Sequence, residues 1–190
     1  MKLHSTPLPG VLILEPSVIA DERGWFMESF NEARFNHAVQ ALGLAMPPRF
    51  VQDNHSCSNA GVLRGLHYQL PPHAQGKLVR VVQGAAYDVA VDITPGSPTF
   101  GRWFGIELSA SNQRQLWIPP GFAHGFLALT QDTHFLYKTT DVYARECERS
   151  IRFDDEAIGI QWPTVPGVPR LLVAPKDAAA PLLAHADLPG

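Results

Sequence analysis

Residues 49–69 of the chain read RFVQDNHSCSNAGVLRGLHYQ, and our interpretation of the fold starts from this stretch. We predict a strand over 49–55, a turn over 56–60 and a second strand over 61–69. Polar and titratable side chains interrupt the apolar residues of both strands: Gln52, Asn54, Arg64 and His67. Because a packed core would favour Val or Leu at such positions, the pattern predicts a polar-lined pocket rather than a filled core.

The composition is that of an ordinary globular protein. The chain has 190 residues, 45% of them hydrophobic, which is enough for one domain with its own core, so we expect a single domain over 1–190. With 15 Gly and 17 Pro, turns must be frequent and long helices few. We find no repeat, linker or low-complexity block. The composition therefore favours a β fold with short strands.

The net charge and the terminal segments limit the kinds of partner and the location that we expect for this protein. A net charge of −3 implies no general affinity for nucleic acid, so an anionic ligand must be held by local cations. We find no signal-peptide pattern and no apolar run long enough to cross a membrane. The two cysteines, Cys57 and Cys147, lack a metal-type spacing and are typical of semi-buried free thiols. We expect a soluble cytoplasmic protein.

Apolar periodicity predicts one clear helix and a series of strands. The helix spans 31–43, with Asn31 as its N-cap and Gly43 as its stop. Strands are indicated by apolar runs and period-two alternation between Gly/Pro turns, at 11–14, 78–82, 87–93, 103–108, 116–118, 126–129 and 135–139. A short terminal helix is expected over 177–185, with Asp177 as its N-cap. Many closely spaced short strands predict an all-β sandwich, jelly roll or barrel with a few short helices.

Motifs along nearly the whole chain resemble one family. They are the opening stretch 49–69 and then 21–24 (DERG), 75–80 (QGKLVR), 88–92 (DVAVD), 96–101 (GSPTFG), 115–119 (QLWIP), 121–126 (GFAHGF), 135–138 (FLYK) and 176–178 (KDA). Together and in this order they are similar to the dTDP-4-dehydrorhamnose 3,5-epimerases. The resemblance implies a cupin-type jelly roll, an isomerase without a cofactor, and a homodimer whose N-terminal strand completes the neighbour's sheet.

The implied substrate is a dTDP-linked 4-keto-6-deoxy sugar, and its chemistry defines what the site needs. Carbons 3 and 5 flank the carbonyl, so their protons are acidic. Inverting either centre requires removal of a proton from one face of the ring and delivery of a proton to the other. The site therefore needs two proton-handling groups on opposite sides and a donor that holds the enolate oxygen.

His67 is the candidate base, because imidazole titrates near working pH, where general-base catalysis is most efficient. Considered alone, it is more readily a hydrogen-bonded structural histidine, and the surrounding motif favours the catalytic role. The resemblance gives it Asp177 as a partner that fixes the tautomer and stabilises the imidazolium. The alternative for Asp177 is the N-cap noted above, and the two roles are compatible.

Arg64 and His67 lie three residues apart, so in a regular strand they point to opposite faces. We predict that Gly65 marks a β-bulge that turns both side chains into one pocket. Regular pairing through Gly65 would contradict this.

Two further residues complete the implied catalytic set. Tyr137 is the candidate acid on the other face, since a phenol is protonated at neutral pH; the alternative is a core aromatic in phase with Phe135. Lys77 is the candidate for holding the enolate oxygen, because an ammonium in a dry pocket stabilises developing negative charge; the alternative is a surface lysine.

The resemblance also implies substrate-binding residues. Guanidinium and ammonium groups suit the diphosphate, which points to Arg23, Arg64 and Lys176. The positions that match nucleotide- or sugar-binding residues are Glu28, Gln52, Asp53, Asn54, Lys77, His124 and Glu148. His124 has the spacing of a cupin metal ligand, but the His-x-His pair of a metal cupin is missing, so we assign it to substrate and expect no metal.

Three other functions remain as alternatives. One is a single-site 3- or 5-epimerase acting on a related dTDP-4-keto sugar. Another is a non-catalytic cupin that binds sugar nucleotides, against which the presence of His67, Lys77 and Tyr137 argues. The last is a metal-dependent oxygenase cupin, against which the missing His-x-His pair argues.

Overall fold

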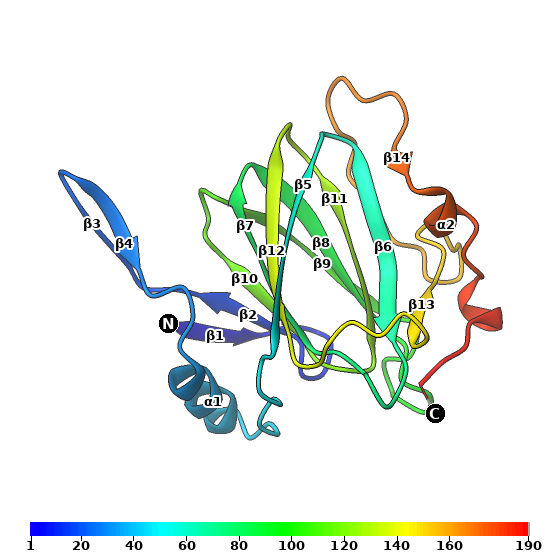
Figure 1. Cartoon of the computed structure of the whole chain (residues 1–190), viewed down its shortest axis with the longest axis horizontal. Helices are drawn as coiled ribbons and strands as arrows, with labels where there is room; N and C mark the ends of the chain where they lie inside the picture. The colour runs from blue at the N-terminus through cyan, green and yellow to red at the C-terminus, as the bar shows by residue number, and fades with distance from the viewer. Residues whose placement is uncertain (190) are drawn as a thin grey trace.

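The computed structural model describes residues 1–189, and two β-sheets form its body (Figure 1). The first sheet has six strands, in the order β1 (Lys2–Ser5), β2 (Leu12–Glu15), β10 (Gln115–Ile118), β7 (Lys77–Gln83), β12 (Thr133–Thr139) and β5 (Gln52–Ser58). The second has β13 (Glu148–Ser150), β6 (Val62–Gln69), β11 (Phe122–Ala128), β8 (Ala85–Asp92) and β9 (Trp103–Ser109), with β14 (Leu172–Val173) parallel to β6. A separate hairpin joins β3 (Val18–Asp21) to β4 (Gly24–Met27).

Apolar side chains from both sheets form the core between them. Val79 and Phe135 contribute from the six-stranded sheet, and Ala90 and Phe126 contribute from the other. The rings of Phe126 and Phe135 stack face to face, with centroids 4.0 Å apart. Such alternating inward residues are what holds a two-sheet fold together. Gln52, Asn54, Arg64 and His67 of the opening stretch are not part of this apolar core.

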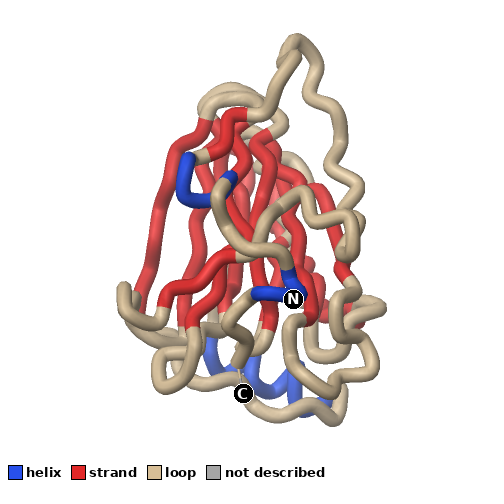
Figure 2. The backbone as a smooth tube through the Cα atoms, turned by 90° about the vertical axis from the view of Figure 1, so that its right-hand side faces the viewer, coloured by secondary structure: helices blue, strands red, loops and turns tan. Residues whose placement is uncertain are grey.

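Helices and irregular segments cover the outer surfaces, which Figure 2 shows as blue and tan around the red strands. Helix α1 (Glu32–Ala41) packs Phe35 and Val39 against Leu12, Leu14 and other side chains of the six-stranded sheet. The C-terminal region carries helix α2 (Pro175–Ala178) and the 3-10 turn η1 (Leu183–His185), which lie beside β6 and β13 in Figure 1. Within residues 1–189, no helix has the length and apolar character needed to cross a membrane.

The prediction of an all-β, two-sheet fold with a few short helices is confirmed. The helix predicted over 31–43 is α1, and Asn31 caps it by accepting a hydrogen bond from the Arg34 N–H at 3.1 Å. Gly43 follows the helix with φ of +72°, a conformation that favours glycine. Each predicted strand corresponds to an observed one, although β11 begins four residues before the expected start at Phe126.

Several details of the sequence interpretation are wrong. In the opening stretch, β5 runs through Ser58 and the turn lies at Asn59–Gly61, because Ser56–Ser58 still pair with β12. The strand predicted over 11–14 is preceded by β1, and the hairpin of β3 and β4 was not expected. No continuous helix spans 177–185, because α2 ends at Ala178 and η1 begins at Leu183, on either side of Pro181.

Candidate active site

A cavity of about 350 Å³ lies between the sheets and is lined by β6 and β11 on one side and β7 and β12 on the other. It adjoins a second hollow of about 140 Å³, because four side chains line both: His67, Lys77, Tyr137 and Glu148. The larger cavity brings together eight of the predicted site residues: Arg64, His67, Lys77, His124, Tyr137, Glu148, Lys176 and Asp177.

A β-bulge explains why both Arg64 and His67 reach this cavity. His67 pairs with His124 and Arg64 pairs with Phe126, so β6 has one more residue than β11 between the two pairs. Gly65 has φ of +127°, and a Cβ built there would lie 2.5 Å from the Gly125 Cα. Only glycine fits this close approach of the two strands. The predicted bulge at Gly65 is therefore confirmed.

Asp177 holds both the bulge and the candidate base. Its Oδ1 lies 2.8 Å from Nε2 of His67, and its Oδ2 accepts a hydrogen bond from the Gly65 N–H at 3.2 Å. Burial alone would raise the pKa of Asp177, but the hydrogen bond and charge of His67 outweigh it and the pKa is lowered. The carboxylate thus receives the imidazole N–H and leaves Nδ1 of His67 as the ring nitrogen with a lone pair.

Asp177 is not an N-cap, contrary to one of the two interpretations we considered. It is the third residue of α2, whose N-cap is Ala174. The side chain is almost fully buried, with 2% of its surface exposed, because it points at His67 and the Gly65 backbone rather than at the start of its own helix.

Lys77 is buried in the wall opposite His67 and is not the surface lysine of the alternative interpretation. Its ammonium donates to the backbone carbonyl of His67 at 3.1 Å. Burial lowers its pKa to about 8, although the nearby carboxylates of Asp88 and Glu148 counteract this. A charged donor that is shielded from water in this way is well suited to bind an oxyanion.

Tyr137 enters the cavity from β12, so it and His67 belong to different sheets. Its ring packs against the core between the sheets, which agrees with the core-aromatic interpretation, while the same side chain lines the cavity. Burial raises the pKa of Tyr137, so the phenol keeps its proton at neutral pH. A ligand held between the sheets would meet His67 on one side and Tyr137 on the other.

A second imidazole–carboxylate pair lies next to His67, because His124 on β11 is the cross-strand neighbour of His67 on β6. Nε2 of His124 is 2.7 Å from Oδ1 of Asp88, whose side chain is fully buried. Burial lowers the pKa of His124, more than Asp88 raises it. Sequence reasoning missed Asp88, because a lone Asp in an alternating strand is indistinguishable from an outward-facing polar residue. Within residues 1–189, no group of three or more His, Cys, Asp or Glu side chains is arranged to hold a metal ion.

Charged and aromatic residues form the rim of the cavity. Lys176 and Glu148 form an ion pair at 3.1 Å. Burial alone would raise the pKa of Glu148, but the hydrogen bond and charge of Lys176 outweigh it, so the pKa is lowered. Arg64 donates from Nε to Ser58 Oγ at 3.1 Å. Tyr143, which we did not predict, donates a hydrogen bond from its hydroxyl to the Glu148 carboxylate and lines the smaller hollow. The exposure of its ring is a feature of the structure, and no pattern in the sequence marked this residue.

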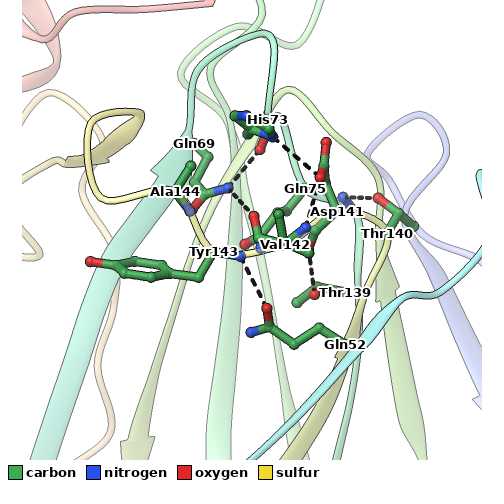
Figure 3. Close-up of polar contacts among 11 residues, drawn as sticks. Gln52, Gln69, His73, Gln75, Thr139, Thr140, Asp141, Val142, Tyr143 and Ala144 are labelled. Carbon is green, nitrogen blue, oxygen red and sulfur yellow. Dashed lines mark hydrogen bonds and ion pairs between the residues drawn. The ribbon is translucent and has the colours of Figure 1, made fainter.

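The loop that carries Tyr143 is fixed by amide side chains (Figure 3). Gln69 accepts from the Ala144 N–H at 2.8 Å, and Gln75 donates to the Asp141 carbonyl at 2.8 Å. Gln52 accepts from the Tyr143 N–H at 3.0 Å, and in Figure 3 the Tyr143 ring points away from this network. The predicted site residue Gln52 thus holds the loop as well as lining the hollow.

Strand alternation separates the three neighbouring residues predicted on β5. Gln52 and Asn54 line the smaller hollow, and they are joined by a hydrogen bond of 3.0 Å. Asp53 points to the opposite face of the sheet, where it pairs with Lys138 at 2.8 Å. Asp53 therefore lines neither the cavity nor the smaller hollow of this chain, and its role in substrate binding stays a prediction.

Arg23 and Glu28 also lie outside the cavity of this chain. Arg23 stands in the turn between β3 and β4, pairs with Asp21 and has 85% of its side chain exposed. Glu28 binds Asn31 and Arg34 near the start of α1. The β3–β4 hairpin projects from the body of the molecule in Figure 1, and neither Arg23 nor Glu28 lines the cavity that contains His67.

The sequence is similar to known proteins over nearly its whole length. The family model for dTDP-4-dehydrorhamnose 3,5-epimerase matches residues 5–185. An enzyme of that name from Salmonella typhimurium is 55% identical, over 99% of this chain and 98% of the relative. One from Shigella flexneri is 53% identical, over 98% of both.

A solved structure shows the same fold. It is a dTDP-6-deoxy-D-glucose-3,5-epimerase from Legionella pneumophila in complex with dTDP-4-keto-L-rhamnose. It matches with a TM-score of 0.90 and 49% identity, covering 99% of this chain and 97% of that chain. The two sheets described above are therefore those of a cupin-type jelly roll, as the sequence resemblance implies.

Proposed function

This chain belongs to the dTDP-4-dehydrorhamnose 3,5-epimerase family, and we propose that the cavity between its sheets is the active site. The protein is an isomerase that converts dTDP-4-dehydro-6-deoxy-D-glucose to dTDP-4-dehydro-L-rhamnose by inversion at C3 and C5. The observation that supports our assignment of roles is geometric. The His67–Asp177 pair and Tyr137 enter one cavity from opposite sheets, with Lys77 beside them.

The reaction begins with proton removal by His67. Its Nδ1 takes the proton from C3 or C5, and the C–H electron pair becomes the double bond of an enolate with negative charge on O4. Asp177 stabilises the imidazolium through Nε2, and the Lys77 ammonium donates to O4. Tyr137 then donates its phenolic proton to the carbon from the other face. Exchange with solvent returns a proton to Tyr137 and removes one from His67.

Turnover is tested directly with the purified protein and dTDP-4-dehydro-6-deoxy-D-glucose. We expect proton NMR to show new sugar resonances with the couplings of the product inverted at both centres. A product inverted at one carbon would support a single-site epimerase. Tight nucleotide binding without turnover would support a non-catalytic binding module.

Tyr137→Phe is expected to uncouple exchange from inversion. Phenylalanine keeps the ring packing against the core and removes only the O–H that delivers the proton. His67 would still remove protons, so substrate in heavy water should gain deuterium with retained configuration. We expect inverted product to form about 10²–10⁴-fold more slowly. Inversion at the wild-type rate in this variant would show that Tyr137 is not the acid.

The rim is suited to the nucleotide end of the substrate. Arg64 and Lys176 provide two cations at the mouth of the cavity, where they fit a diphosphate. Tyr143 presents an aromatic face beside Gln52 and Asn54, which fits a base that needs stacking and amide hydrogen bonds. We therefore place the sugar at His67 and the thymine at Tyr143.

A homodimer accounts for two of the predicted residues that lie outside the cavity, Arg23 and Glu28. The β3–β4 hairpin exposes large apolar side chains that a single copy leaves in solvent: Ile19 (66%), Trp25 (58%) and Phe26 (69%). Strand β5, which carries Gln52 and Asn54, is an open edge of the six-stranded sheet. Docking of the hairpin from one copy beside β5 of the other would cover both surfaces. It would also bring Arg23 and Glu28 to the neighbour's cavity.

Mixing two inactive variants tests this arrangement. Arg23→Ala and His67→Ala each disable the site they contribute to, but a mixed dimer keeps one intact site if Arg23 acts across the interface. After subunit exchange about half of the dimers are mixed, so about a quarter of wild-type activity should return. Mixtures that stay inactive after mass spectrometry has confirmed exchange would show that Arg23 does not act in the partner's site.

We also propose that the enzyme works in the cytoplasm. Cys57 and Cys147 are both free, as is usual for proteins of a reducing compartment, although Cys57 is exposed rather than semi-buried as predicted.

A further inference from the structure

Asp88 is the buried carboxylate of the active-site region whose negative charge is least compensated. Its side chain has no exposed surface, and only Oδ1 has a partner, the imidazole of His124 at 2.7 Å. Its Oδ2 is buried without any hydrogen bond. A buried carboxylate oxygen left in this state costs free energy unless a nearby positive charge stabilises it.

Lys77 is the cation placed to provide that stabilisation. Its ammonium donates to a neutral carbonyl, that of His67, and forms no ion pair within 4.0 Å in the described part of the chain. Asp88 acts on it most strongly among the carboxylates that counteract the lowering of its pKa by burial, and Glu148 comes second. His124, the hydrogen-bond partner of Asp88, lines the same cavity as Lys77. Asp88 and Lys77 are therefore two opposite buried charges of this region without direct contact.

The other titratable groups around Lys77 already have partners or are neutral. Glu148 on β13 is ion-paired with Lys176 at 3.1 Å, and Asp177 on α2 is bound to His67 at 2.8 Å. On β12, Tyr137 keeps its proton because burial raises its pKa. His124 on β11 is held neutral because burial lowers its pKa. Asp88 is the carboxylate left to balance Lys77.

We propose that Asp88 is a positioning residue, whose carboxylate fixes the ring of His124 through Oδ1 and keeps the Lys77 ammonium charged for binding the enolate oxygen. This inference rests on the proposed role of Lys77 and deepens it. With Nε2–H of His124 donated to Asp88, its Nδ1 carries the lone pair and accepts a hydrogen bond from a sugar hydroxyl. Asp88 thus acts through two cavity residues without touching the substrate.

Asp88→Asn tests the charge separately from the shape. The amide oxygen of asparagine still accepts from His124, but the negative charge is gone. The pKa of Lys77, already near 8, should then fall further, so the ammonium loses its proton at lower pH. We expect the alkaline limb of the kcat–pH profile to move to lower pH by about one unit or more, with the acid limb unchanged. The loss of kcat should shrink as the pH is lowered.

Asp92→Asn is the matched control. Asp92 lies on the same strand and is equally buried, but its partners are the Ser97 and Thr99 hydroxyls and the Thr94 N–H. This variant should lower stability and leave the kcat–pH profile in place. A uniform loss of kcat in Asp88→Asn, with both limbs unmoved, would show a merely structural role. Absence of turnover in the wild type would instead contradict the proposed function itself.

A measurement on the wild-type protein keeps the proposal testable if Asp88→Asn does not fold. Nitrogen-15 NMR of the histidine rings reports which nitrogen carries the proton. We expect His124 to be neutral between pH 6.5 and 8, with its proton on Nε2. A proton on Nδ1 of a neutral His124, or a doubly protonated ring, would overturn the proposal.

Discussion

His67→Ala is expected to abolish both deuterium exchange and inversion at C3 and C5. The change removes the ring nitrogen that accepts the substrate proton, and Asp177 is left without its partner 2.8 Å away. General-base catalysis contributes about 10²–10⁴-fold to the rate. Because it initiates every proton transfer here, the loss of rate should be at least as large as the top of that range. Exchange is measured by NMR of the sugar protons in heavy water.

His37→Ala is the control for this prediction. His37 is exposed on helix α1 and lies outside the cavity, so its replacement should leave exchange at the wild-type rate. Circular dichroism and thermal unfolding of both variants establish that the fold is retained. If His67→Ala retains exchange at the wild-type rate, another group is the base.

Lys77→Met is expected to lower kcat about 10²–10³-fold. Methionine keeps the apolar stem of the buried side chain but removes the ammonium that meets the developing charge on O4. KM should change much less than kcat, because the interaction strengthens as the enolate forms. Steady-state kinetics of the purified variant measure both kcat and KM. A variant with unchanged kcat would exclude Lys77 as the oxyanion donor.

The wild-type pH profile provides an independent test of Lys77. Its ammonium is the active form and its pKa lies at about 8 because of burial. Raising the pH through that value removes the proton, so kcat should fall on the alkaline side, where an exposed lysine would still be charged. The alkaline limb assigned to Lys77 should be missing from the residual activity of Lys77→Met.

Period-two alternation and Gly/Pro turns were sufficient to predict the two-sheet fold, because both are local consequences of strand geometry. The β3–β4 hairpin lacks this signal, because its apolar residues do not alternate: Trp25 and Phe26 are consecutive. Ile19, Trp25 and Phe26 are all exposed in this chain. A pattern of apolar residues does not specify which surface will cover them.

The candidate site was predictable where a local signal existed. Gly65 between Arg64 and His67 predicts the bulge, because a glycine inside a strand marks a close backbone approach. The side chain of Asp177 has no such signal. Its contact with His67 spans 110 residues of sequence, so capping at a helix start was as good an interpretation until the fold placed the two together. Asp88 lacked any local signal.

The position of deuterium in the product tests the central claim most directly. Wild-type protein is incubated with dTDP-4-dehydro-6-deoxy-D-glucose in heavy water, and the sugar is analysed by NMR. If His67 and Tyr137 act from opposite faces at both carbons, the inverted product must carry deuterium at C3 and at C5. Deuterium at only one carbon, or inverted product with no deuterium at either, would contradict this account.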